Sequence, residues 1–137
     1  MTASVLEAWH RIVKEDDWEA LKVLLAEDAV FHSPVVHTPQ RGRELVLLYL
    51  SSAAKVLGGA GFRYVREVAS GTDAALEFEA EIDGIHINGV DLIRWNDAGK
   101  IVDFKVMVRP LKAVNLLHRQ MKTMLEEIAA GQGKQSG

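Results

Sequence analysis

The carboxyl group of Asp91 is the strongest candidate for acid–base chemistry in this sequence. It lies among apolar residues within segment 85–95, which has the composition of a β-strand. In a regular strand Asp91 shares a face with Ile93 and Trp95, and Arg94 points to the other side. Burial on that face would raise the pKa of the carboxyl group toward neutral pH, where it can donate or accept a proton. We therefore predict a catalytic aspartate; the alternative is a structural one that hydrogen-bonds a neighbour.

Two histidines are further candidates, because imidazole titrates near physiological pH. His32 lies on the short apolar segment 29–33, and His37 lies in the loop that follows it. We predict His32 as a second catalytic residue and His37 as a substrate contact at the mouth of a pocket. Alternation along the strand opposes the first prediction, since it turns His32 away from Phe31 and Ser33. Solvent-exposed or structural histidines are the alternative.

The histidine spacing does not favour a metal site. The chain contains 5 His and no Cys, and no pair of histidines is spaced as His-x-His or His-x-x-x-His. Zinc and other transition-metal sites usually draw on such local pairs or on cysteines. We expect neither a metal nor another cofactor.

Aromatic side chains are the main candidates for contacts with an apolar ligand. Inside a domain they usually belong to the core, and in a hollow domain part of the core lines the cavity. The hydroxyl of Tyr49 is also a candidate donor to a ligand carbonyl. The residues that we predict to contact a substrate are Trp9, Phe31, Ser33, His37, Tyr49, Phe78, Trp95 and Phe104.

Four segments with helical spacing of apolar residues indicate the helices that must position these side chains. The stripe Leu6, Trp9 and Val13 is typical, and the pattern Asp16-Asp-Trp-Glu19 indicates a cap at the start of the second helix. The expected helices cover residues 4–13, 18–25, 43–56 and 111–129.

Alternating or apolar segments indicate the strands. In segment 75–82 the glutamates at every second position face water, and Asp83-Gly84 then predicts a tight hairpin turn. The expected strands cover residues 29–33, 62–69, 75–82, 85–95 and 100–109.

Length and composition indicate one domain over residues 1–130 and a disordered tail over 131–137. The chain has 137 residues, 48% of them hydrophobic, and a net charge of −3 without a basic cluster, so we expect no nucleic-acid partner. We expect no membrane partner either, since no apolar run reaches about 18 residues. The absence of cysteine and of a signal-peptide pattern favours a cytoplasmic location.

The motifs "AEDAVFHSP" over 26–34 and "VDLIRWNDAGKIVDFKVMVRP" over 90–110 resemble the nuclear transport factor 2-like superfamily, in particular its SnoaL-like polyketide cyclase and ketosteroid isomerase branch. The resemblance covers residues 4–112. It implies an α+β fold in which a curved, mostly antiparallel sheet wraps around N-terminal helices. The result is a cone with an internal pocket, here with an extra C-terminal helix.

The same resemblance bears on the reaction. Ketosteroid isomerases place a carboxylate base directly before the proline that ends the first strand, and that position is Ser33 here. A hydroxyl is not a base near neutral pH, so the resemblance argues against ketosteroid isomerase activity. The tyrosine donor of the first helix corresponds to Trp9, and the buried aspartate donor corresponds to Asp91. Polyketide cyclase relatives use an aspartate of the sheet as acid–base group, and Asp91 matches that role.

Four functions remain open at this point. The first is acid–base isomerisation or cyclisation of a small apolar carbonyl compound, and the second is non-catalytic binding of a small hydrophobic ligand. The third is epoxide hydrolysis with Asp91 and Arg94, and the fourth is a structural dimer with a filled pocket. We expect a homodimer, as the family often forms.

Overall fold

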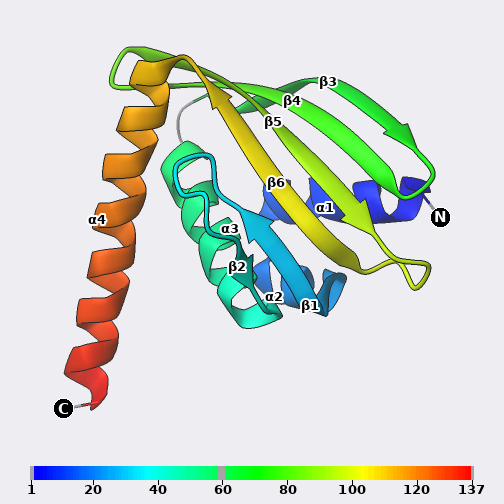
Figure 1. Ribbon diagram of the computed structural model, residues 1–137, viewed down its shortest axis with the longest axis horizontal. Helices are drawn as coiled ribbons and strands as arrows, with labels where there is room; N and C mark the ends of the chain where they lie inside the picture. Colours follow the sequence, from blue (N-terminus) through cyan, green and yellow to red (C-terminus); the bar gives the residue numbers. More distant parts are fainter. Residues whose placement is uncertain (1, 59–60, 137) are drawn as a thin grey trace.

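The computed structural model describes residues 2–58 and 61–136, and in this part of the chain helices pack against one curved sheet (Figure 1). The α+β class expected from the sequence is confirmed. The helices are α1 (Thr2–Glu15), α2 (Trp18–Leu24), α3 (Arg43–Leu57) and α4 (Leu111–Ser136). The strands are β1 (Leu25–His32), β2 (Gln40–Arg41), β3 (Arg63–Ser70), β4 (Asp73–Ile82), β5 (Ile85–Trp95) and β6 (Ile101–Arg109).

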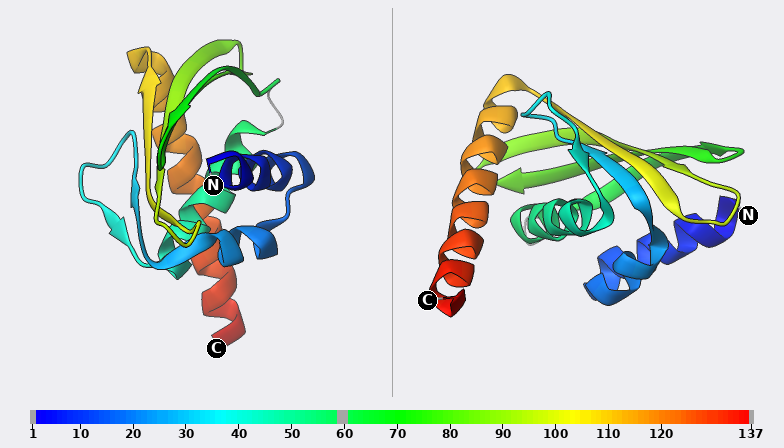
Figure 2. Two further views of the ribbon diagram at one scale, coloured as in Figure 1. Left: turned by 90° about the vertical axis from the view of Figure 1, so that its right-hand side faces the viewer. Right: turned by 60° about the horizontal axis from the view of Figure 1, so that its bottom comes forward.

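The sheet has the strand order β2-β1-β6-β5-β4-β3. Only the β1–β6 pair is parallel, and the other neighbours in this sheet run antiparallel. Figure 2 shows the sheet arching over α1, α2 and α3, which lie together on its concave side. The space that matters for function therefore lies between this concave face and the three helices.

The long hairpin of β4 and β5 follows from its sequence pattern. Leu76, Phe78 and Ala80 are buried on the concave side, while Glu77 and Glu79 alternate with them on the outer face. The turn between the strands has positive φ at Asp83 (52°) and Gly84 (77°), as a tight two-residue hairpin requires. This hairpin carries the predicted strand of Asp91 into the centre of the sheet.

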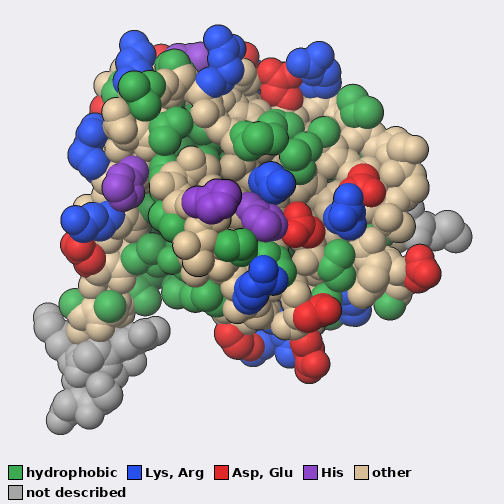
Figure 3. Space-filling view, in the orientation of Figure 1, with side chains coloured by type: hydrophobic (Ala, Val, Ile, Leu, Met, Phe, Trp, Pro, Cys, Tyr) green, Lys and Arg blue, Asp and Glu red, His purple; other side chains and the backbone are tan. Residues whose placement is uncertain are grey.

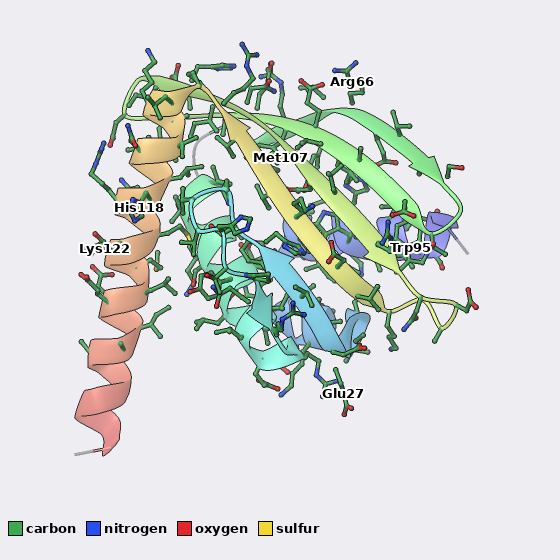
Figure 4. All side chains as sticks on the ribbon, viewed as in Figure 1. Glu27, Arg66, Trp95, Met107, His118 and Lys122 are labelled. Atoms are coloured by element: carbon green, nitrogen blue, oxygen red, sulfur yellow. The ribbon has the colours of Figure 1, made fainter. Side chains whose placement is uncertain are left out.

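The outer face of the sheet is charged, and its charges are largely paired within the chain. Arg63 contacts Glu79 at 2.6 Å, and Arg66 contacts Glu77 at 2.7 Å. Arg66 and Met107 are labelled on this face in Figure 4, and Figure 3 shows side chains of both charges spread across the visible surface. Two glutamates of the row predicted to face water, Glu77 and Glu79, are thus paired with arginines of the neighbouring strand.

The first two strands differ from the expected boundaries. β1 begins at Leu25, directly after α2, and not near Ala29. β2 is a two-residue strand in the segment predicted as a loop, with Val30 opposite Arg41 and Phe31 opposite Gln40. A segment of two residues is too short to show the alternation of apolar and polar residues that predicts a strand. β2 is therefore recognised only by its pairing with β1.

The helix α4 closes one end of the sheet. Ala113, Leu116 and Leu117 pack with Phe78 and Ile87 in a second core cluster, separate from the main core under α1 to α3. The rest of α4 extends away from the body (Figure 1). Its backbone continues to Ser136, through most of the segment 131–137 predicted as a tail, and Gly137 lies outside the described residues. Among the described residues, no helix is both long and apolar enough to cross a membrane.

Candidate functional site

A cavity of about 730 Å³ lies between the concave face of the sheet and the helices. Sites for small molecules commonly measure roughly 300–1,000 Å³ and are mainly apolar. Most of the wall here is aromatic or aliphatic, and it comes from all four helices and from the sheet. Its buried part includes Trp9, Phe31, Leu50, Phe78, Asp91, Phe104 and Leu117.

Asp91 is the only carboxyl group in the buried part of this wall, as far as the described residues go. It stands opposite Leu76 of β4 and Val106 of β6, both of which face the concave side. Its exposed fraction is 6%, so water solvates the carboxyl group poorly. Regular alternation along β5 therefore brings one buried carboxyl group into a mainly apolar chamber.

Tyr64 and Trp9 connect to this carboxyl group in a chain of hydrogen bonds. The hydroxyl of Tyr64 donates to Oδ2 of Asp91 at 2.5 Å. The indole Nε1 of Trp9 donates in turn to the Tyr64 hydroxyl at 3.1 Å. Because both donors are held by packing, they fix the orientation of the carboxyl group. Oδ1 of Asp91 receives no hydrogen bond from the described residues and is the oxygen left for a ligand.

Burial sets the acid–base properties of this group. Desolvation raises the pKa of Asp91 from its usual value near 3.8 to about 7, and the hydrogen bond from Tyr64 opposes part of that rise. Burial, and then the negative charge of Asp91, raise the pKa of Tyr64 well above its usual value. Tyr64 therefore remains a neutral donor while Asp91 exchanges its proton near physiological pH.

The comparisons with known proteins agree with this architecture. The sequence model of the SnoaL-like domain matches residues 6–104. The chain belongs to the SnoaL-like family. The superfamily and branch proposed from the sequence motifs are thereby confirmed. A comparison of this SnoaL-like chain with curated proteins gives no match.

Solved structures resemble the SnoaL-like chain over nearly its whole length. A steroid delta-isomerase from Pseudomonas aeruginosa has 38% sequence identity over 93% of each chain, with a TM-score of 0.89. A bacterial protein with a cystatin-like fold from Silicibacter pomeroyi has 32% identity over 96% of this chain and 92% of its own, with a TM-score of 0.85. A de novo designed protein with a curved β-sheet shares the fold alone, at 19% identity over 85% and 93% of the two chains and a TM-score of 0.66.

Six of the predicted site residues of the SnoaL-like chain do line the cavity. Ser33 is among them, but its Oγ accepts a hydrogen bond from the backbone N–H of Val35 at 3.1 Å. That contact makes a local turn beside Pro34 and gives the hydroxyl a structural partner. The six are Trp9, Phe31, Ser33, Phe78, Asp91 and Phe104.

The two predicted histidines do not line the cavity. His32 points to the outer face of the sheet, where its Nε2 lies 2.9 Å from Oδ1 of Asp103. The reason is the strand alternation already noted, because Phe31 and Ser33 occupy the inward positions. His37 is exposed in the loop after β1 and is not part of the cavity wall. The prediction of His32 as a catalytic residue of the pocket is therefore corrected.

Two predicted aromatic contacts belong to the core instead. Tyr49 stacks on Phe31 with 5.8 Å between the ring centres, while Leu50 of the same helix lines the cavity. Tyr49 lies about 100° around the helix from Leu50, and its ring packs toward Phe31 and the main core. Trp95 shares the inward face with Asp91 and is 3% exposed, but it packs in the main core beyond the cavity.

The most important residue that the sequence analysis missed is Tyr64. It lies on β3 two residues after Phe62, which directly precedes the strand, and both rings line the cavity. That spacing was available in the sequence as a sign of an inward hydroxyl. Leu117 and Met121 of α4 also line the cavity, so this helix forms part of the site wall. No group of three or more potential metal ligands occurs within residues 2–58 and 61–136.

The positions of Asp91 and Arg94 do not support epoxide hydrolysis by this pair. Nε of Arg94 donates to Oδ1 of Asp73 at 2.9 Å on the outer face, on the side of β5 opposite to Asp91. The two residues therefore cannot act on one water molecule in the cavity.

Proposed function

We propose that this SnoaL-like protein binds a small apolar carbonyl compound in the cavity and isomerises or cyclises it with Asp91 as the acid–base group. The observation that carries the proposal is a buried carboxyl group, bonded to Tyr64 and with a pKa of about 7, in the wall of a mainly apolar cavity. A group with that pKa holds and releases a proton with similar ease at physiological pH, which suits it to both halves of a proton shuttle.

The proposed reaction needs no cofactor or co-reactant. In its ionised form Asp91 accepts a proton from the carbon next to the ligand carbonyl, and the electron pair of that C–H bond forms an enolate. The neutral carboxyl group then returns the proton to another carbon of the ligand, which completes an isomerisation. In a cyclisation the enolate carbon instead attacks a second carbonyl of the ligand, and the proton goes to the new alkoxide oxygen.

Tyr64 acts in this proposal as a positioning residue. Its hydroxyl occupies Oδ2 of Asp91 and leaves Oδ1 for the ligand. Trp9 holds the tyrosine from the other side. The steroid delta-isomerase with 38% identity supports ketones as the first compounds to test. Ser33 at the strand end supports a reaction that uses the sheet aspartate alone.

The experiment is a thermal-shift screen of steroid ketones and polyketide-like aromatic ketones, followed by incubation of every stabilising compound and product analysis. A compound bound only by the folded state raises its melting temperature. We expect Asp91→Asn to retain ligand binding and lose turnover. Asp103→Asn, an equivalent change on the outer face, is the control and leaves turnover intact. A folded Asp91→Asn variant with wild-type turnover would rule out the proposed role.

Non-catalytic binding is the second candidate, and the hydrogen bond that ties the Ser33 hydroxyl to Val35 favours it. With no base before Pro34, the cavity can hold a ligand without converting it. Recovery of a stabilising compound chemically unchanged after long incubation supports this candidate. The same panel therefore separates an enzyme from a binding protein.

We also propose that the protein forms a homodimer through the outer face of its sheet. Val68 is 61% exposed and Met107 48% exposed on this face. Glu77 and Glu79 are already paired with arginines, so a partner need not neutralise them. Sedimentation of the wild type and of Met107→Glu tests the idea, since a buried charge at a dimer interface shifts the protein to monomer. A wild type that sediments as a monomer contradicts it.

A further inference from the structure

We infer that the ligand of this cavity carries one negative charge at the end that lies at the rim, next to Lys14 and Lys55. This inference rests on the proposed function, because it assumes that the cavity holds a ligand. It adds the substrate class: an apolar carbonyl compound with a carboxylate or comparable anion at the end opposite to the reacting carbonyl.

The charged residues of the cavity wall differ in their exposure to solvent. Asp91 is buried and bonded to Tyr64, whereas the other charged residues of the wall are exposed. Lys14 and Asp16 come from the end of α1 and the turn after it, and Lys55 comes from the last turn of α3. Two positive charges and one negative charge at the rim leave a net charge of +1 there.

The two lysines are available to a ligand. Neither Lys14 nor Lys55 forms a salt bridge with another described residue. The other basic residues of α1 and α2 differ in this respect: Arg11 is paired with Glu15 and Asp17, and Lys22 with Glu44. Cations that border an apolar chamber and have no partner of their own are suited to hold the anionic end of a bound molecule.

The buried end of the cavity excludes an anion. A charged group placed among Phe78, Phe104 and Trp9 would lose its water without gaining a cation. The ionised form of Asp91 would repel it as well. An amphipathic ligand is therefore oriented in one way only, with its anion at the rim and its neutral carbonyl group at Asp91.

The test uses matched pairs of compounds that differ only in charge. The first pair is a steroid ketone with a carboxylic acid at the end opposite the ketone, and its primary amide. The second is an aryl ketone acid and its amide. We expect the acid to bind about two- to fivefold more tightly than the amide at low salt, as for an exposed ion pair, and this preference to shrink at high salt.

Variants locate the effect at the rim. The double variant Lys14→Gln/Lys55→Gln should remove the preference for the acid while the affinity for the amide is unchanged. Asp16→Asn should increase the preference, since it removes the competing carboxylate. Lys112→Gln, an exposed lysine of α4 outside the cavity wall, is the matched control and should change neither affinity.

The outcomes separate this inference from the proposed function. If the amides bind but the acids bind no better, or if the preference survives in the double variant, the charge inference is wrong and the cavity still binds neutral ketones. If none of the compounds binds to the wild type, the proposed function fails, and the inference fails with it.

Discussion

The hydroxyl of Tyr64 on β3 reaches Oδ2 of Asp91 on β5 across the intervening strand β4. Tyr64 stands opposite Phe78, and Phe78 stands opposite Gly89, two residues before Asp91 on the same face. Between them the ring of Phe78 packs closely against Gly89, where a Cβ would lie 2.4 Å from its Cζ.

Burial of Asp91 predicts a specific dependence of stability on pH. The pKa of Asp91 rises to about 7 in the folded state, so the folded protein binds more protons than the unfolded chain between about pH 4 and pH 7. As the pH rises through this range, the free energy of unfolding of the wild type should therefore fall relative to that of Asp91→Asn, by up to roughly 4 kcal/mol. Urea unfolding of both proteins at pH 5 and pH 8 should detect about 3 kcal/mol of this fall, and the effects of groups that the two proteins share cancel in the comparison. Equal changes in the two proteins would contradict a buried, titrating Asp91.

Replacing Tyr64 by phenylalanine should raise the pKa of Asp91 further. The lost hydroxyl is a donor that favours the ionised carboxyl group, and only desolvation remains. The variant also leaves the Trp9 indole without its acceptor, so we expect a loss of about 1–3 kcal/mol in stability. The carboxyl carbon resonance of Asp91, followed by NMR across a pH titration, reports the pKa directly. Tyr49→Phe is the control, because Tyr49 lies outside the cavity wall.

Sequence patterns alone predict the part of the sheet that surrounds Asp91. The alternation of apolar residues and glutamates along β4, and the Asp83-Gly84 turn, define the hairpin and its two faces locally. In the structure, the strand faces that carry Asp91, Phe78 and Phe104 all turn toward the cavity. The same alternation predicts that His32 points away from Phe31 and Ser33, and in the structure it does.

These local patterns do not predict which side chains from distant segments come into contact. Tyr64 and Asp91 are 27 residues apart, and their meeting depends on the bulge in β3 and on the small residue at Gly89. Periodicity also separates inward from outward residues but does not divide the inward ones between core and cavity. Trp95 is inward as expected, yet its position near Ile101 places it in the core.

The close packing of Gly89 predicts that alanine at this position disturbs the cavity. An added Cβ would lie 2.4 Å from Cζ of Phe78 and 2.8 Å from the backbone oxygen of Met107. The ring must then move, so we expect a loss of about 1–3 kcal/mol in stability and weaker ligand binding. Phe78→Leu in the Gly89→Ala background should recover part of the loss, because the smaller side chain makes room. Additive losses in the double variant would show that the two residues do not interact in this way.

Removal of the Ser52 hydroxyl, in contrast, should stabilise the protein. Ser52 is 1% exposed on α3, and its Oγ has no hydrogen-bond partner among the described residues. A buried hydroxyl without a partner is destabilising, and alanine has the higher helix propensity. Ser52→Ala should therefore raise the free energy of unfolding by about 0.5–2 kcal/mol in urea titrations. Ser51→Ala is the matched control, because its hydroxyl donates to the backbone oxygen of Leu48 at 3.2 Å, and there we expect no gain. Destabilisation by Ser52→Ala would mean that the hydroxyl has a bonding partner after all.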